Sequence, residues 1–243
     1  MRVAVISDIH GNLHALEAVF RALESEGADT LWSLGDVVGY GPRPNACCER
    51  VAARASVSLA GNHDLGVLGS LDLDEFSPDA AAAALWTRSV LSPGARAYLE
   101  PLTPQATAPG TELFHASPRD PIWDYVISAE AAADAFRLTR AEIVLVGHSH
   151  VPLAIGLEPG GELGGGLAAA GSEVDLGAGR WLLNPGSVGQ PRDGDPRASY
   201  LLLDLATGRA QFGRVEYPIG RTQAELRQRG LPAALADRLA EGV

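Results

Sequence analysis

Two short motifs place possible metal ligands two residues apart: Asp8-x-His10 near the start of the chain and His148-x-His150 farther along. In an extended segment, residues at positions i and i+2 point to the same side, so each pair can direct two ligand atoms at one point. Carboxylates and imidazoles together bind first-row divalent metals. A turn carboxylate beside a surface histidine gives the same spacing, so neither motif predicts a metal site by itself.

Further polar residues stand just after apolar stretches of strand length. They are Asp36, Asn62, His63, Asp64 and His115. Three of these are consecutive, and an amide, an imidazole and a carboxylate in succession cost free energy if they are buried without partners. This group therefore favours ligand binding over a plain turn. His14, by contrast, lies in a predicted helix, where we expect a solvated structural role.

The elements that must position these side chains are predicted to be strands and helices in alternation. Apolar runs of strand length end shortly before the polar motifs, at 3–6, 31–34, 57–60, 112–114 and 143–146. Apolar residues at three- and four-residue steps predict helices between them, at 13–23, 45–54, 78–90 and 129–138. Loops leaving the carboxyl ends of strands in α/β sheets converge and bind ligands there. We therefore expect the motifs to share one pocket.

The pattern changes after residue 150 to short strands without helices between them, which predicts antiparallel pairing. These strands are expected at 153–157, 180–183, 200–205 and 211–216. The Gly- and Ala-rich segment 159–171 has no apolar period, so we expect a mobile hairpin tip or loop. A terminal helix is expected over 222–239, broken near Pro232.

Length and composition are those of an ordinary globular protein. The 243 residues, 46% of them hydrophobic, predict a single domain over 1–243. No apolar run approaches membrane-spanning length or a signal peptide, so the cytoplasm is the expected location. The adjacent Cys47 and Cys48 are expected to be packing residues. A net charge of −11 disfavours nucleic acid and membrane surfaces as partners. The sequence leaves the oligomeric state open.

In chain order, the motifs DxH, GD, GNHD, H and GHxH resemble those of the calcineurin-like metallophosphoesterase superfamily, in its bacterial phosphodiesterase-like branch. The resemblance covers residues 1–150. It implies an α/β fold, a four-layer sandwich of two mixed β-sheets flanked by helices. It also implies two divalent metal ions. Manganese, iron or zinc is expected, because the ligands combine hard oxygen with imidazole and include no thiolate.

The resemblance also assigns a role to each motif. The first metal would bind Asp8, His10, Asp36 and His150. The second would bind Asp36, Asn62, His115 and His148, with Asp36 as the bridge. His63 would hydrogen-bond the phosphoryl group or protonate the leaving oxygen, and Asp64 would orient nearby groups. Substrate contacts are expected from Asn62, His63, Tyr40 and Arg192.

Some positions depart from the protein phosphatase and diadenosine tetraphosphatase branches. Tyr40 stands where those branches carry a phosphate-binding arginine, and Gly39 replaces the acid that pairs with the catalytic histidine of the protein phosphatases. The segment from Asn184 to Arg192 resembles one found in small bacterial phosphodiesterase-like members, and both of these residues are candidates for substrate contact. Tyr40, Arg43 or Arg192 is expected to shape the substrate pocket.

The sequence thus predicts dinuclear-metal-dependent hydrolysis of phosphate esters, with a phosphodiester of a small molecule or nucleotide as the favoured substrate. A protein phosphatase or a dinucleoside polyphosphate phosphatase is the alternative within the superfamily. A metal-binding regulatory module with little turnover is the alternative outside the enzymes.

Overall fold

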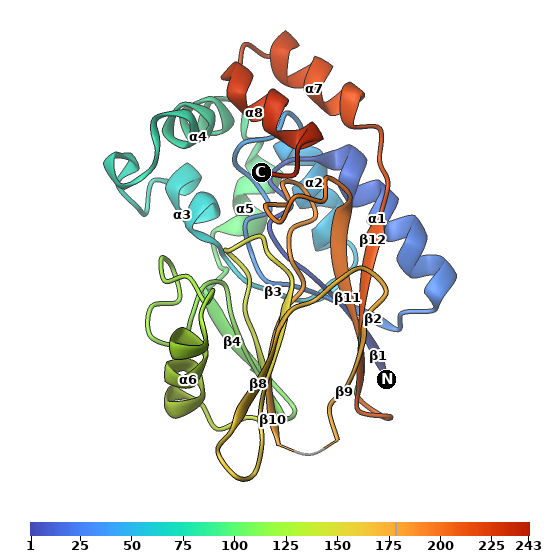
Figure 1. Ribbon diagram of the computed structural model, residues 1–243. Helices are drawn as coiled ribbons and strands as arrows, with labels where there is room; N and C mark the ends of the chain where they lie inside the picture. The colour runs from blue at the N-terminus through green and yellow to red at the C-terminus, as the bar shows by residue number, and fades with distance from the viewer. Residues whose placement is uncertain (178) are drawn as a thin grey trace.

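The computed structural model describes residues 1–177 and 179–243, which form two six-stranded sheets packed face to face (Figure 1). In spatial order, the first sheet contains β3 (Ala55–Ser58), β2 (Thr30–Ser33), β1 (Arg2–Ile6), β11 (Ala198–Asp204), β12 (Arg209–Val215) and β9 (Glu173–Asp175). The second contains β4 (Gln105–Ala108), β5 (Thr111–Phe114), β6 (Ile143–Leu145), β10 (Arg180–Asn184), β7 (Leu153–Leu157) and β8 (Leu163–Leu167).

Both sheets are mixed, as the sequence predicts. In the first sheet, β1, β2 and β3 run parallel, and β11 pairs antiparallel with β1. In the second, β6 pairs parallel with both β5 and β10. The antiparallel pairing expected after residue 150 holds for β7, β8, β9, β11 and β12 but is wrong for the contact between β10 and β6. That contact is parallel because β10 inserts between β6 and β7.

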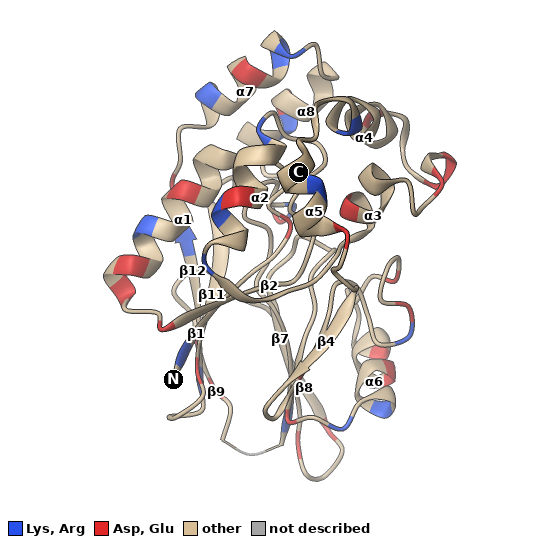
Figure 2. Cartoon of the chain, turned by 180° about the vertical axis from the view of Figure 1, so that it is seen from behind, with Lys and Arg blue, Asp and Glu red and all other residues tan. Residues whose placement is uncertain are grey.

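Helices complete the layers. The outer face of the first sheet is covered by α1 (Leu13–Glu26) and α2 (Pro44–Ala52), and that of the second by α6 (Ala129–Leu138) (Figure 1). The remaining helices gather at one end: α3 (Asn62–Leu68), η1 (Leu73–Glu75), α4 (Pro78–Val90), α5 (Pro93–Leu99), α7 (Ile219–Gln228), α8 (Ala233–Asp237) and η2 (Arg238–Ala240). Charged residues of both signs lie mostly in helices and loops (Figure 2). Among the described helices, none has the length and apolar character needed to cross a bilayer.

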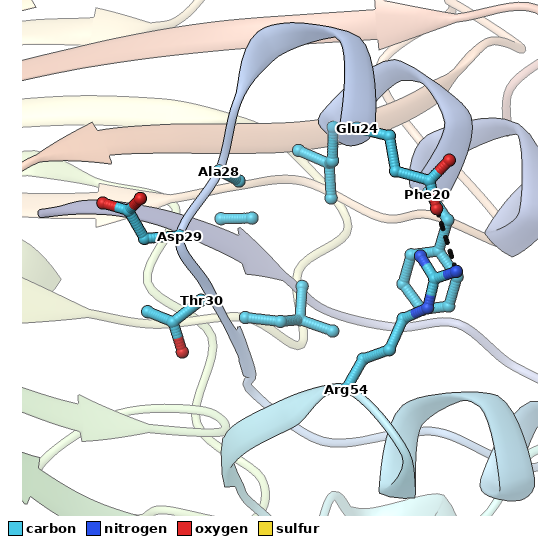
Figure 3. A pocket seen from close by; sticks show the side chains of 9 residues that line it. Phe20, Glu24, Ala28, Asp29, Thr30 and Arg54 are labelled. Atoms are coloured by element: carbon cyan, nitrogen blue, oxygen red, sulfur yellow. Dashed lines mark ion pairs between the residues drawn. The ribbon is translucent and has the colours of Figure 1, made fainter.

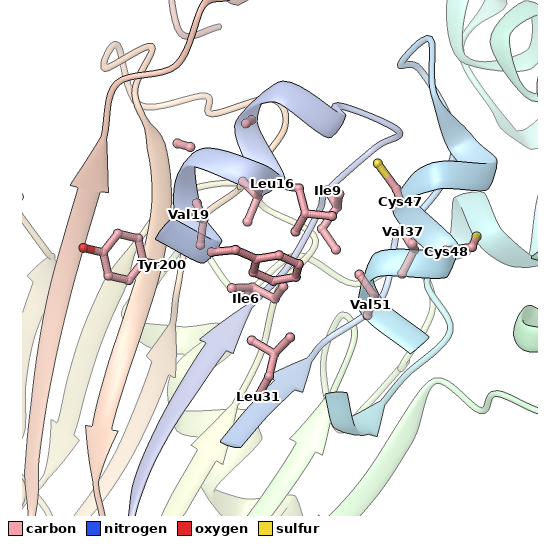
Figure 4. Close-up of a cluster of buried hydrophobic side chains, with 14 of the residues drawn as sticks. Ile6, Ile9, Leu16, Val19, Leu31, Val37, Cys47, Cys48, Val51 and Tyr200 are labelled. Atoms are coloured by element: carbon pink, nitrogen blue, oxygen red, sulfur yellow. The ribbon is translucent and has the colours of Figure 1, made fainter. Parts of the chain in front are cut away.

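Alternating side chains connect the layers. In β1, Val3 and Val5 join the core between the two sheets, whereas Ala4 and Ile6 join the core under α1 and α2. This two-residue period is what a strand buried on both faces requires. Cys47 and Cys48 are buried in the helix-side core, so the expectation that they are packing residues is confirmed (Figure 4).

Several elements differ from the sequence prediction. The segment 159–171 is not wholly a loop, because β8 lies within it and forms a hydrogen-bonded ladder with β7. A ladder is made by main-chain groups and needs no apolar period. Gly165 illustrates the constraint, since its φ is +105° and a Cβ there would lie 2.2 Å from the Ala154 carbonyl oxygen. The sequence pattern also does not predict the short elements α3, α5, β4 and β9. The break in the terminal helix is confirmed.

Candidate metal centre

The predicted metal ligands lie in loops that leave neighbouring strands at one edge of the two sheets. Asp8 and His10 follow β1, Asp36 follows β2, Asn62 begins α3 after β3, His115 follows β5, and His148 and His150 follow β6. All of these side chains are buried. Main-chain hydrogen bonds tie the loops together, such as His10 N to Asp36 O at 2.9 Å and Gly147 N to His115 O at 2.8 Å. The fold thus brings together residues as distant in sequence as 8 and 150.

The backbone at this edge is strained. Six residues other than glycine have a left-handed backbone, with φ between 49° and 62°: Asp8, His10, Asp36, Tyr40, His148 and His150. Such a conformation costs an L-residue roughly 1–2 kcal/mol and persists only where the surrounding structure imposes it. Five of the six are predicted metal ligands, and the sixth is a predicted substrate contact. Strain of this kind is typical of functional sites.

Each of two aspartates has one oxygen bound and the other free of partners. Asp8 Oδ2 accepts a hydrogen bond from His148 N at 3.1 Å, and Asp36 Oδ1 accepts one from His63 N at 2.9 Å. The other oxygens, Asp8 Oδ1 and Asp36 Oδ2, are buried without a partner among the described residues. Asp36 Oδ2 lies 3.6 Å from Nε2 of both His10 and His115. These free oxygens therefore face imidazoles rather than water.

The imidazoles are oriented from behind. Nδ1 of His10, His115 and His150 lies 3.2, 2.8 and 2.6 Å, respectively, from a main-chain carbonyl oxygen. A carbonyl oxygen only accepts, so each Nδ1 carries the proton and each Nε2 of the neutral ring carries a lone pair. Metal-binding histidines are held in this way in proteins. Nε2 of His148 is also buried without a partner among the described residues.

Burial opposes charge on both aspartates and on three of the histidines. It raises the pKa of Asp8 to about 7 and also raises that of Asp36. It lowers the pKa of His10 and His150, and it lowers that of His148 to about 2. The protein alone therefore leaves the carboxylates without enough positive charge and the imidazole lone pairs without protons. A divalent cation would supply both a positive charge and an acceptor for the lone pairs.

The candidate ligand atoms form two neighbouring groups. Atoms of Asp8, His10 and His150 lie within 4.8 Å of one another, and so do atoms of Asp36, His115 and His148. Asn62 Oδ1 lies 3.2 Å from His115 Nε2 and joins the second group. Atoms of His10, Asp36 and His63 also lie within 4.8 Å of one another, so distance alone does not distinguish His63 from the predicted metal ligands. The oxygen and imidazole donors fit divalent cations such as manganese, iron or zinc.

Two glycines allow the loops to approach. A Cβ at Gly61 would lie 1.9 Å from Asp36 Oδ1, and a Cβ at Gly39 would lie 2.6 Å from His63 Nδ1. Gly39 therefore leaves room for the His63 ring, whose Nδ1 is buried without a partner among the described residues. Asp64 does not orient this ring. Its carboxylate accepts hydrogen bonds from the main-chain N–H groups of residues 37, 38 and 61, so it joins the loop after β2 to the start of α3.

A cavity of about 370 Å³ opens beside the centre. Asn62, His63, Tyr40 and Arg192, the predicted substrate contacts, all line it. The sequence does not predict the other lining residues, among them Phe76, Trp123, Tyr125 and Arg238. The Tyr125 ring stacks on His148 with centroids 4.2 Å apart, and Phe76 lies edge-to-face against Trp123 at 5.1 Å. One wall of the cavity is therefore aromatic.

Two candidate substrate contacts have structural roles instead. Arg43 binds Glu225 through two hydrogen bonds of 2.6 Å and lies outside the cavity. Asn184 is fully buried, and its Nδ2 donates to the Gly147 carbonyl oxygen at 2.9 Å and to Ser149 Oγ at 3.0 Å. It therefore supports the loop that carries His148 and His150. His14 contacts Glu225 at 3.1 Å, and its side chain is 18% exposed, so its structural role is less solvated than expected.

A second hollow, of about 210 Å³, lies away from the centre, between α1 and β2 (Figure 3). The Arg54 guanidinium in this hollow already has partners within the protein. It forms an ion pair with Glu24 at 2.9 Å and lies over the Phe20 ring at 4.4 Å. None of the predicted ligands or substrate contacts lines it.

The sequence profile of the calcineurin-like phosphoesterase superfamily domain matches residues 1–208. The chain therefore belongs to this superfamily and is a metal-dependent phosphoesterase, a hydrolase of phosphate esters. The crystal structure of a metallophosphoesterase from Sphaerobacter thermophilus is 45% identical in sequence, covers 100% of this chain and 99% of that one, and superposes with a TM-score of 0.91. This superposition confirms the four-layer fold.

Two further proteins are similar in sequence over most of this chain. An uncharacterized protein of Methanocaldococcus jannaschii is 38% identical over 243 residues, which cover 98% of this chain and 96% of that protein. The phosphodiesterase YfcE of Escherichia coli is 28% identical over 214 residues, which cover 84% of this chain and 88% of that enzyme.

Proposed function

We propose that the chain is a phosphodiesterase for small-molecule or nucleotide substrates and that it uses two divalent metal ions. The proposed ligands are Asp8, His10, Asp36 and His150 for one ion, and Asp36, Asn62, His115 and His148 for the other. The observation that carries the proposal is the pair of buried carboxylate oxygens, Asp8 Oδ1 and Asp36 Oδ2, that have no partner among the described residues; Asp36 also lines the cavity. When bound, manganese, iron or zinc would stabilise negative charge on a phosphoryl group and activate a water molecule.

The chain's own side chains would bind the substrate and move a proton. The Arg192 guanidinium attracts the phosphate, and Tyr40 and Asn62 bound the same cavity. His63 Nδ1 is buried against Gly39, so Nε2 is the ring nitrogen available to the cavity. From this atom His63 donates a hydrogen bond to the phosphoryl group or a proton to the departing oxygen.

A diester is favoured over a monoester because the cavity has room and an aromatic wall for a second ester group. Trp123 and Tyr125 line the cavity beside His148, and an aromatic ring of the substrate can stack on such side chains. The similarity to a phosphodiesterase of Escherichia coli supports the same choice.

The test is hydrolysis of bis-p-nitrophenyl phosphate with manganese by the wild type, Asp36→Asn and His148→Ala. Both variants are expected to lose turnover and bound metal while keeping their folded spectrum, and Asp74→Asn, an exposed carboxylate in η1, is the matched control. Unchanged turnover in either site variant contradicts the proposal. Phosphopeptides and dinucleoside polyphosphates assayed beside the diester distinguish a phosphatase, and protein that is inactive with two bound metals indicates a regulatory module.

A further inference from the structure

Two arginines from separate parts of the chain line the same cavity. Arg192 lies in the loop after β10, and Arg238 begins η2, next to α8. The main-chain N–H of Arg192 donates to the His150 carbonyl oxygen at 3.3 Å, which fixes it beside the metal centre. The charge of Arg192 lowers the pKa of Arg238, an effect second only to burial, so the two guanidinium groups are close enough to repel each other.

Each guanidinium keeps N–H groups for which no described residue supplies an acceptor. Arg192 Nη2 donates to Gln190 Oε1 at 2.9 Å, and its Nε is buried without a partner among the described residues. Arg238 Nε donates to an oxygen of Val243, the last residue of the sequence, at 2.6 Å, and Asp79 also attracts its charge, whereas its Nη atoms have no acceptor in the described part of the chain. Neither residue forms an ion pair with a described carboxylate within 4.0 Å, unlike Arg43 with Glu225.

Arg238 is held in place by packing. Leu226 of α7, Leu235 of α8 and Leu239 of η2 form a buried cluster with Tyr40 and with Ala80 of α4. The packed helices fix the backbone of Arg238, and the hydrogen bond from its Nε to Val243 holds the side chain, so less conformational freedom remains to be lost when it binds a ligand. The C-terminal helices therefore present Arg238 to the cavity as a fixed binding group.

An acidic chain that brings together, in one cavity, two guanidinium groups with N–H groups left free by the described residues is suited to bind anions there. The phosphoryl group to be hydrolysed already faces the metal ligands and Arg192. A diester carries one negative charge, so it leaves the Nη atoms of Arg238 without an acceptor among the described residues. Glu75 also lines the cavity, but it is exposed, so water screens its repulsion of an anion.

We propose that Arg238, in the same cavity as Arg192, binds a second phosphate of the substrate, one that is not hydrolysed. The preferred substrate class is then a nucleotide diester that carries an additional phosphate group. This inference rests on the proposed phosphodiesterase function and deepens it. Guanidinium groups bind phosphate through paired charge-assisted hydrogen bonds, which accounts for a second arginine in the lining of the cavity.

The test uses two substrates that differ only in the second phosphate: thymidine 5′-(p-nitrophenyl phosphate) and its 3′-phosphorylated form. Wild-type protein with manganese is expected to have a kcat/KM about tenfold higher for the phosphorylated compound, mainly through KM. Arg238→Ala is expected to reduce this ratio to about twofold, and Arg238→Lys to keep part of it because a lysine retains the charge. Arg229→Ala, an exposed change between α7 and α8, is the control and should keep the full ratio.

Calorimetry separates the inference from the proposed function, because it needs no turnover. Wild-type protein is expected to bind thymidine 3′,5′-bisphosphate about tenfold more tightly than thymidine 5′-monophosphate, and Arg238→Ala to lose most of that difference. Equal affinities in the wild type, or a full difference in Arg238→Ala, overturn the inference. Absence of turnover with both esters, together with the expected binding, overturns the proposed phosphodiesterase function instead.

Discussion

Nε2 of His10 and Nε2 of His150 lie 3.1 Å apart, although both Nδ1 atoms face carbonyl oxygens and both rings are buried. The two lone pairs therefore point at each other. Burial lowers the pKa of both rings, so a proton does not bridge them at neutral pH. A cation bound by the two rings would remove the repulsion, and Asp8 Oδ1, 3.5 Å from His150 Nε2, would be a further ligand.

Metal removal is therefore expected to destabilise the protein. A cation that binds only the folded state at 100 times its dissociation constant adds about 2.7 kcal/mol to the free energy of unfolding. For a chain of this size, the melting temperature should fall by roughly 5–10 °C after treatment with a chelator and should recover when manganese is added. Differential scanning calorimetry measures this shift. A melting temperature that ignores both treatments would contradict the metal assignment.

Gly61→Ala is expected to disrupt the centre, because its Cβ would lie 1.9 Å from Asp36 Oδ1 and 2.5 Å from Asp36 N. Displacing this carboxylate should weaken metal binding and activity by roughly 100-fold. Gly94→Ala in α5 is the matched control, since a Cβ at this position would have nothing within 4 Å and alanine favours a helix. Metal titration of the two variants checks the contrast, and equal affinities would show that the close approach at Gly61 is unimportant.

Tyr125→Ala is expected to weaken the binding of substrates with two aromatic ester groups. Loss of the stacked ring should raise KM for bis-p-nitrophenyl phosphate about 3- to 10-fold and leave KM for methyl p-nitrophenyl phosphate less affected. Ile127→Ala, at an exposed position in the same segment, serves as the control. If Tyr125→Ala raises both KM values equally, the aromatic wall does not select the second ester group.

The ion pair between Arg43 and Glu225 predicts a pH-dependent stability. Hydrogen bonds from Arg43 lower the pKa of Glu225 from 4.5 to about 2. Because the folded-state pKa is below the unfolded one, the stabilisation is fully present above pH 4.5 and is lost as the pH falls toward 2. Glu225→Gln should be less stable than the wild type by about 1 kcal/mol at pH 7, a modest value because Arg43 is partly exposed.

Urea denaturation at several pH values checks this prediction. The difference between wild type and Glu225→Gln should narrow steadily below pH 4.5. A difference that is the same at neutral pH and near pH 3 would mean that the charge of Glu225 contributes nothing.

The sequence predicts the strands well, and with them the convergence of the motifs at one edge of the sheets, because both depend on local pattern. Apolar runs set β1 and β2, and the helix periods set α4 and α6 at the bounds 78–90 and 129–138 that the structure has. The motifs follow these strands directly, so the fold class locates them. The start of α3 at Asn62 is less visible, because it depends on the Asp64 carboxylate accepting from Gly61 N.

The remaining features depend on contacts between distant segments. The pairing of Arg43 with Glu225 spans 182 positions, and no local pattern distinguishes it from phosphate binding. Asn184 likewise resembles a substrate contact in the sequence, whereas in the structure its amide donates a hydrogen bond to the loop after β6. Tyr125 and Arg238 lie in short irregular or helical segments, and only the folded chain brings them to the cavity.

The most direct test of the account is a crystal of the wild-type protein grown with manganese and measured at a wavelength where manganese scatters anomalously. The account predicts two anomalous peaks per chain, both in contact with Asp36, with one also beside His10 and His150 and the other beside His115 and His148. A centre without peaks at saturating manganese, or with a single peak that does not contact Asp36, would contradict it.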